Sequence, residues 1–194
     1  MIRAGFETTD PITNTRTIVI QGAEETEGRG WVLEVHCPEG APPAIMEHVH
    51  LGWTETFEIL GGSAAYTLDG QQQVAEEGEI ITMRPGLKHV HPWNIGSGEM
   101  VYRQSNDFGA VSPDAVHEVL GVFATINGLA GEGKIGMKGL PKNPLQLAAC
   151  LRLLAKHEGF DAALPIAAQR FVSATLGRLA ERLGYHGADP RFTS

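Results

Sequence analysis

The sequence is short of cysteine and of basic charge, and each shortage argues against a class of protein. Cys37 and Cys150 are the only cysteines among 194 residues. They are too few for a disulfide framework, so we expect a reducing compartment. Acidic residues outnumber basic ones by 23 to 15, for a formal net charge of −8. That balance opposes binding to nucleic acid or to an anionic membrane, because both need a basic face.

Long apolar segments are also missing. No stretch of 18 apolar residues occurs, so we expect no membrane span. The first ten residues, MIRAGFETTD, lack the apolar segment of a secretory signal. Together with the cysteine content, these features predict a cytoplasmic protein. The 42% of hydrophobic residues supply enough apolar side chains for one domain with its own core, alone or with an appendage.

Short strand-like segments separated by glycine and proline turns fill the first 110 residues. They are β-branched or alternate in polarity, and they cover residues 15–20, 31–36, 55–60, 64–68, 71–74, 80–83 and 100–105. Asp69-Gly70, between two of them, is a strong hairpin signal. The alternation in 55–60 places Glu55, Phe57 and Ile59 on one face. Many short strands with frequent turns predict an antiparallel sandwich or barrel.

After about residue 111 the apolar residues recur at helical spacing. We therefore divide the chain into a β domain, 1–110, and a helical extension, 111–194. Ser112-Pro113 and Asn143-Pro144 each combine a capping residue with proline at the first helical position. We expect the first helix to stop at Asn127-Gly128 and the second before Gly159. The last helix carries an apolar stripe made of Ala168, Val172, Leu176, Leu179 and Leu183. The stripe needs a partner, either the barrel wall or a second subunit, so a homodimer is plausible.

Two histidine pairs lie in the β region. His48 and His50 are two residues apart, and so are His89 and His91 about forty residues later. In a strand, residues i and i+2 point to the same face. Histidine is the commonest metal ligand, because its neutral nitrogen is available near pH 7. Two imidazoles on one face can therefore bind one ion if further ligands come from nearby.

The spacing of these residues resembles the two motifs of the cupin superfamily, specifically small single-domain cupin-2 proteins. The first motif is matched by Gly40, His48, His50, Glu55 and Gly62, with a longer gap than usual after Gly40. The second motif is matched by Gly78-Glu79, Gly86 and His89. Arg84 stands where the family has proline, and Asn94 comes one position late. The likeness covers about residues 30 to 105.

The resemblance implies a mainly β fold, the cupin double-stranded β-helix or jelly-roll barrel, followed here by the helical extension. It also implies that one divalent transition metal is bound by His48, His50, Glu55 and His89. Three neutral imidazoles and one carboxylate form a mixed nitrogen and oxygen site that suits Fe, Mn, Ni, Cu or Zn. The alternative is a set of ordinary strand histidines that are exposed or hydrogen-bonded.

His91 shares the face of His89 by the strand period. It could line the cavity, act as a catalytic acid or base, replace Glu55 as a ligand, or bond a backbone carbonyl as a wall residue. Four further residues could line an apolar pocket or belong to the barrel core. They are Phe57, Tyr66, Met83 and Trp93.

The leading functional hypothesis is a metal-dependent enzyme acting on a small organic molecule, with a dioxygenase-like oxidoreductase the most favoured class. Its basis is an open metal site inside an apolar barrel. One alternative is a metal-dependent isomerase or lyase in which His91 moves a proton. Another is a non-catalytic cupin module that binds a small ligand.

Overall fold

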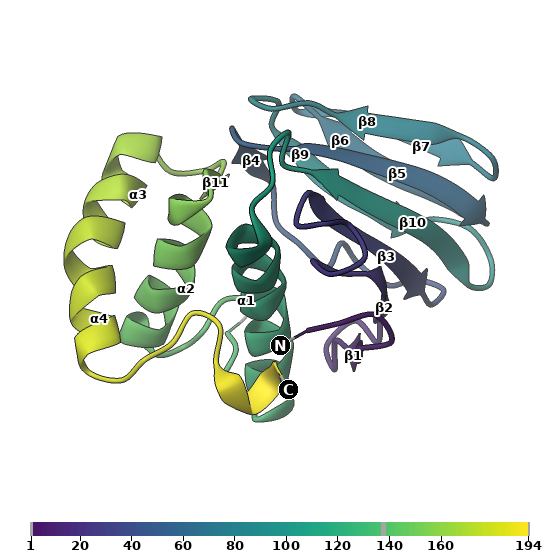
Figure 1. The fold of residues 1–194 in the computed structure, drawn as a ribbon. Coiled ribbons are helices and arrows are strands. Elements are labelled where there is room, and N and C mark those ends of the chain that lie inside the picture. The colour runs from purple at the N-terminus through teal and green to yellow at the C-terminus, as the bar shows by residue number, and fades with distance from the viewer. Residues whose placement is uncertain (1, 137–138, 194) are drawn as a thin grey trace.

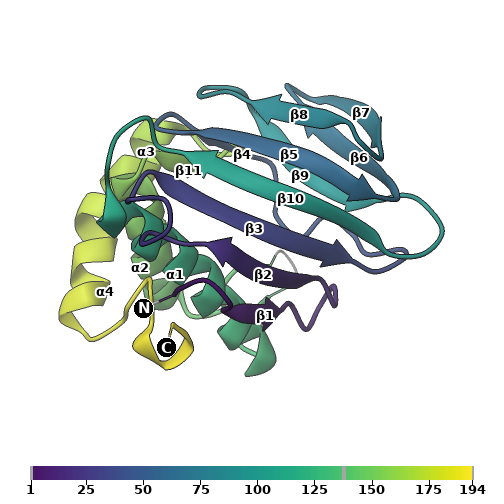
Figure 2. The same ribbon diagram turned by 45° about the vertical axis from the view of Figure 1, so that its right-hand side comes forward.

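The computed structural model describes residues 2–136 and 139–193. Two antiparallel sheets face each other, and helices cover one side of the molecule (Figure 1). The strands of the first sheet lie side by side in Figure 2, in the order β1-β2-β3-β10-β5-β8. Its strands are β1 Glu7–Thr9, β2 Arg16–Gln21, β3 Gly30–Cys37, β10 Met100–Asp107, β5 Thr54–Gly61 and β8 Ile80–Met83.

The second sheet has the order β11-β4-β9-β6-β7. Its strands are β11 Gly159–Asp161, β4 His48–His50, β9 His89–Asn94, β6 Ser63–Leu68 and β7 Gln71–Glu76. In this sheet β4 pairs with β9 through His48 and His89. The pairing brings together the two histidine pairs that lie far apart in the sequence.

Alternation along the strands decides which side chains enter the barrel. In β3, Trp31, Leu33 and Val35 are buried and Glu34 and His36 are only partly so. Strands β5 and β10 follow the same period, and their inward positions include polar residues next to apolar ones. Since side chains alternate across a strand, these polar residues are held inside the barrel and not at its surface.

Helix α1, Pro113–Gly131, begins at Ser112 as predicted but runs past the predicted stop at Asn127-Gly128. Gly128 lies against the ring of Phe192, and a Cβ at position 128 would come within 2.2 Å of that ring. The glycine therefore permits close packing of the C-terminal segment and does not end the helix. On its other face, α1 buries Val116 and Val119 against the barrel core.

Helix α2, Pro144–Lys156, is capped by the Asn143 side chain, which accepts hydrogen bonds from the backbone N–H groups of Leu145 and Gln146. The chain then forms β11, a strand that the sequence did not predict. β11 pairs with β4, placing Gly159 opposite His50 and Asp161 opposite His48. The segment after residue 110 thus contributes a strand beside the first histidine pair.

The predicted last helix consists of α3 Ile166–Val172, a π-helical turn η1 Ser173–Gly177, and α4 Arg178–Arg182. Gly184 follows with φ +86° and ends it as expected. A short 3₁₀ turn, η2 Pro190–Phe192, lies near the C-terminus. The buried residues of the last helix are small or polar: Gln169, Ser173, Gly177 and Ala180.

The predicted apolar stripe on this helix points away from the rest of the chain. Leu176, Leu179 and Leu183 of the stripe are exposed, and so is Phe171, outside the stripe, at 69%. Gly177 approaches α2 so closely that a Cβ would come within 2.8 Å of the Arg152 side chain. Small residues allow this close packing, so the larger apolar residues are left on the outer side. Within the described residues, no helix has the length and apolar character needed to cross a membrane.

Candidate metal centre

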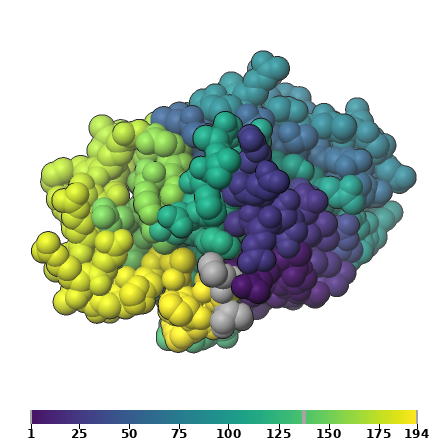
Figure 3. Space-filling view, viewed as in Figure 1, coloured from purple at the N-terminus to yellow at the C-terminus, as the bar shows by residue number. Residues whose placement is uncertain are grey.

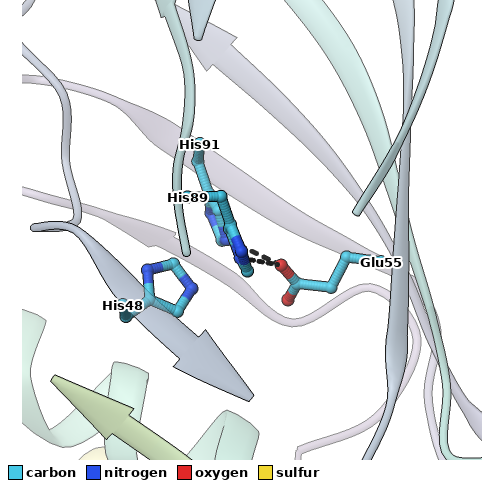
Figure 4. A group of neighbouring side chains, drawn as sticks. All are labelled: His48, Glu55, His89 and His91. Atoms are coloured by element: carbon cyan, nitrogen blue, oxygen red, sulfur yellow. Dashed lines mark hydrogen bonds and ion pairs between the residues drawn. The ribbon is translucent and has the colours of Figure 1, made fainter. Parts of the chain in front are cut away.

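Five side chains from three strands converge inside the barrel, and we call them the histidine–glutamate cluster. Strand β4 supplies His48 and His50, β5 supplies Glu55, and β9 supplies His89 and His91. Figure 4 shows Glu55 reaching towards the parallel rings of His89 and His91, with His48 beside them. All except His48 are buried, and Glu55 is only 2% exposed.

One carboxylate oxygen is the centre of the cluster. Glu55 Oε2 lies 3.1 Å from His50 Nε2, 3.2 Å from His89 Nε2 and 2.9 Å from His91 Nε2. His48 also belongs to the group, because the ligand atoms of His48, Glu55, His89 and His91 all lie within 4.8 Å of one another. The ring centres of His48 and His89 are 4.3 Å apart. Three of the four predicted ligands, His48, Glu55 and His89, thus form one group with His91, and His50 approaches this group through Glu55 Oε2.

The other oxygen of Glu55 is fixed by amide donors. Its Oε1 accepts hydrogen bonds of 3.1 Å from both Gln104 and Asn106, which project inward from β10. The indole N–H of Trp53 donates to the same oxygen at 3.4 Å. Because Oε1 is occupied, Oε2 is the oxygen presented to the imidazoles.

Hydrogen bonds to backbone carbonyls set the tautomers of three of the histidines. The Nδ1 atoms of His48, His50 and His89 lie 2.8–2.9 Å from the carbonyl oxygens of residues 46, 53 and 87. A carbonyl can only accept, so each Nδ1 carries the proton. In the neutral ring, Nε2 then has a free lone pair.

The pKa shifts of His48, His91 and Glu55 favour neutral rings at the two histidines and an ionised carboxylate. Burial lowers the pKa of His48 well below its usual value, and the neighbouring rings of His91 and His89 reinforce the shift. Burial also lowers the pKa of His91, against the opposing influence of Glu55. Burial disfavours the charged form of Glu55, but the facing imidazoles, His91 foremost, hold its pKa well below its usual range.

The cluster fits a metal ion better than it fits a set of mutual hydrogen bonds. His50 Nε2 is buried without a hydrogen-bond partner among the described residues, although a carboxylate oxygen lies 3.1 Å away. Two acceptors in contact repel each other unless a cation lies between them. In an octahedral site, an ion about 2.1 Å from each ligand atom would place neighbouring ligand atoms about 3 Å apart. This is close to the 3.1 and 3.2 Å between Glu55 Oε2 and the Nε2 atoms of His50 and His89. A donated Nδ1–H is also typical of metal-bound histidines.

His91 differs from the other three. Within the described chain, its Nδ1 has no carbonyl partner, and its Nε2 is 2.9 Å from Glu55 Oε2. A neutral His91 can therefore carry its proton on Nε2 and donate it to the carboxylate. This arrangement makes His91 a partner of Glu55, whereas His50 presents a free lone pair.

A cavity of about 250 Å³ opens onto the cluster between the barrel and the helical segment. His48, Glu55 and His91 line it, as do Leu120 of α1 and Leu154 of α2. Side chains of both helices therefore form part of the cavity wall. Two further polar side chains, Cys37 and Tyr102, line the cavity from the barrel. Burial keeps the thiol and the phenol protonated. Burial raises the pKa of Cys37 to about 11 and raises the pKa of Tyr102 well above its usual value.

The four residues suggested for a pocket occupy different places. Trp93 lies on the cavity wall. Phe57 and Met83 are fully buried in the barrel core, and Tyr66 packs half-buried against that core while its hydroxyl donates to Gln73.

Several residues of the site were not singled out from the sequence. Gln104 and Asn106 fix Glu55, Tyr102 lines the cavity, and Trp53 stacks on His50 with ring centres 4.6 Å apart and planes at 16°. The strand period offered one signal, because Tyr102 and Gln104 lie two and four positions after Met100 in the predicted strand 100–105 and so share its inward face. Trp53 gave no such signal, since it lies in a turn between two strands.

Comparison with known proteins identifies the β part of the chain. Residues 33–103 match the family model described as Cupin domain. A search among curated proteins finds no match. The family match and the two facing antiparallel sheets confirm the predicted fold class, and the helices after residue 112 confirm the C-terminal helical extension.

Solved structures resemble the chain at low identity. A predicted oxalate decarboxylase from Thermotoga maritima is 17% identical, with a TM-score of 0.46, and the match covers 56% of this chain and 98% of that one. An uncharacterised protein with a double-stranded β-helix domain from Klebsiella pneumoniae is 22% identical, with a TM-score of 0.41 and coverage of 49% and 77%. An RmlC-like cupin from Shewanella frigidimarina is 13% identical, with a TM-score of 0.43 and coverage of 53% and 83%. At these identities the likeness concerns the fold alone.

Proposed function

We propose that the protein is a metal-dependent oxidoreductase, because residues 33–103 match the cupin-domain model and surround the histidine–glutamate cluster. Its chemistry is dioxygenase-like and its substrate is a small organic molecule. The observation that carries the proposal is the unpartnered lone pair of His50, which faces a buried carboxylate. A site with free coordination positions that opens into an apolar cavity suits this class of reaction.

The proposed ligands are His48, His50, Glu55 and His89. The tautomers support this choice, since all three histidines donate Nδ1–H to a carbonyl and so present Nε2. A bound Fe, Mn, Ni, Cu or Zn ion would supply Lewis-acid chemistry, and the redox-active members of this group would supply electron transfer as well. The amides of Gln104 and Asn106 hold the carboxylate in its ligand orientation.

His91 and Tyr102 are the groups that can act on a bound substrate. His91 Nε2 holds a proton next to Glu55, and its pKa is lowered by burial, so the neutral ring can accept or return a proton. The Tyr102 hydroxyl has no hydrogen-bond partner within residues 2–136 and 139–193, and it lies on the cavity wall as a protonated donor. Side chains of α1 and α2 line the same cavity.

Elemental analysis and oxygen uptake test the proposal. Protein purified without a histidine tag should contain about one redox-active metal ion per chain. After anaerobic reconstitution with Fe(II) or Cu, it should consume oxygen with at least one member of a panel of small organic substrates. Native zinc, with no oxygen uptake for any metal, would contradict an oxidoreductase and support an isomerase or lyase.

Two alanine variants serve as controls for the roles of the histidines. His50→Ala should lower metal content, because it removes a proposed ligand. His91→Ala should retain the metal and slow turnover, because it removes a proton-transfer group. Equal metal loss in both variants would contradict the distinction drawn between them.

A second copy of the chain is the proposed partner of the outer helical face, which we define as Phe171, Leu176, Leu179 and Leu183. Phe171 is 69% exposed and Leu179 is 48% exposed. The helices that carry these residues form one whole side of the molecule in Figure 3. Clustered exposed apolar residues mark interaction surfaces, so this face supports the homodimer expected from the sequence.

Light scattering after gel filtration tests the dimer. We expect a dimeric mass for the native chain and a monomeric mass for the double variant Phe171→Glu, Leu179→Glu, because two buried charges would oppose association. Ile80→Glu is the control, since Ile80 is 66% exposed but lies on strand β8 of the barrel. A monomeric native chain at tens of micromolar, or a double variant that stays dimeric, would rule out this interface.

A further inference from the structure

The charged side chains on the cavity wall are all acidic. The acidic residues that line the cavity are Asp10, Glu47, Glu55 and Asp161. None of the described residues that line it is lysine or arginine. Lys88 is not part of the wall, and its ammonium group contacts the carbonyl of Ala162 at 3.4 Å.

The acidic groups lie close to the proposed metal ligands. Glu47 precedes His48 in the chain, and Asp161 pairs with His48 across the β11–β4 ladder. A divalent ion would offset two of the four negative charges, so the wall would keep an excess of negative charge even when loaded. An anion entering this cavity would meet repulsion that the low polarity of the walls strengthens.

The same carboxylates are poorly placed to bind a cation deep in the cavity. Asp10 accepts hydrogen bonds from the Ile12 amide and the Thr13 hydroxyl, and Asp161 accepts one from the Ala163 amide. Glu55 is committed to the cluster. Glu47 is not hydrogen-bonded, but it adjoins His48, where an ammonium group would also meet the divalent ion. Among the apolar side chains away from Glu47, an ammonium group would lack a close counter-ion, which is costly.

We propose that the substrate of this site is an uncharged, mainly apolar molecule with one polar group, and that organic acids and phosphate esters are excluded. This inference rests on the proposed function, since the polar group would point at the metal and at the Tyr102 hydroxyl. The cavity of about 250 Å³, filled to a packing density of about 0.74, holds a molecule on the order of ten non-hydrogen atoms. A two-ring aromatic alcohol is of that size.

Three probes of one shape and different charge test this selectivity by isothermal titration calorimetry on the metal-containing protein. They are 2-naphthol, which is uncharged, 2-naphthoate, which is an anion, and 2-naphthylmethylammonium, which is a cation. We expect 2-naphthol to bind at least tenfold more tightly than either charged probe. Tighter binding of 2-naphthoate or of the ammonium probe would overturn the inference, and so would the absence of any 2-naphthol binding.

A charge reversal on the wall gives a second measurement. Glu47 has no side-chain hydrogen bond or ion pair within the described residues, so Glu47→Lys breaks no contact and adds a cation at the cavity. We expect this variant to bind 2-naphthoate at least fivefold more tightly than the native protein. Glu77→Lys is the matched control, because Glu77 is exposed in the turn between β7 and β8 and the change in net charge is the same. Equal gains in the two variants would contradict a local effect of the wall.

Metal content and oxygen uptake of the same samples separate the two proposals. A protein that keeps its metal and consumes oxygen but prefers 2-naphthoate would retain the proposed function and lose this inference. A protein without metal that still prefers 2-naphthol would retain this inference and lose the proposed function.

Discussion

Glu55→Gln should abolish metal retention and leave the fold intact. The substitution keeps the shape of the side chain and removes its charge, so Gln104 and Asn106 can still hold the oxygen at Oε1. The new amide nitrogen can donate to the free Nε2 of His50 or His89, 3.1 and 3.2 Å away in the native protein. We therefore expect metal content to fall from about one ion per chain to less than a tenth.

Thermal unfolding with and without chelator measures the same effect as stability. An ion present at about 1,000 times its dissociation constant stabilises the folded state by about 4 kcal/mol. The native protein should lose this contribution on chelation, whereas Glu55→Gln should unfold at one temperature in both conditions. In chelator, the variant gains a hydrogen bond to His50 or His89 but loses the acceptor of the His91 Nε2–H. We therefore expect its stability to stay within about 1 kcal/mol of that of the native protein.

Glu58→Gln is the control for this prediction. Glu58 lies on the same strand, points to the opposite face and pairs with Arg103 at 3.6 Å near the surface. The Glu58→Gln variant should retain the metal, and chelator should lower its unfolding temperature as it does for the native protein. If Glu55→Gln bound metal as well as Glu58→Gln does, the carboxylate would not be a ligand.

Gly159→Ala should weaken the metal site from the helical side of the molecule. A Cβ at position 159 would lie 2.9 Å from the Trp53 ring. The Trp53 ring stacks on His50, and the Trp53 backbone carbonyl accepts the His50 Nδ1–H at 2.8 Å. The indole N–H of Trp53 donates to Glu55. Displacing Trp53 would therefore disturb two proposed ligands at once.

We expect Gly159→Ala to lower metal affinity by at least tenfold, as is typical when groups that orient metal ligands are changed. Overpacking should also cost about 1–3 kcal/mol of stability. Competition with a chromogenic chelator measures the first effect, and denaturant unfolding measures the second. Gly61→Ala is the control, because Gly61 lies in strand β5 with nothing within 4 Å of the added Cβ. Native metal affinity in Gly159→Ala would show that β11 does not position the site.

The β part of the fold was largely predictable, because its signals are local. The hairpin at Asp69-Gly70 joins β6 to β7 as expected, and every strand predicted between residues 15 and 105 is present within a few residues. The convergence of His48, Glu55 and His89 followed from the resemblance of the spacing to known motifs. The helix start at Asn143 could also be predicted, since the cap involves residues that are adjacent in the sequence.

The errors concern contacts between residues that are distant in sequence. Gly128 resembled a helix stop but is a packing glycine beneath Phe192, 64 positions later. Strand β11 has only three residues, and it exists because β4 offers an edge to pair with. The outward direction of the last apolar stripe depends on how closely Gly177 packs against Arg152.

The sequence by itself determined the alternation of the strands, the two histidine pairs and the inward direction of Glu55, since backbone geometry fixes these over a few residues. Only the tertiary structure decided that Trp53 stacks on His50, that backbone carbonyls set the histidine tautomers, and that the cavity wall is acidic. The physical reason is that these properties depend on distances between separate chain segments, which packing sets and local periodicity does not encode.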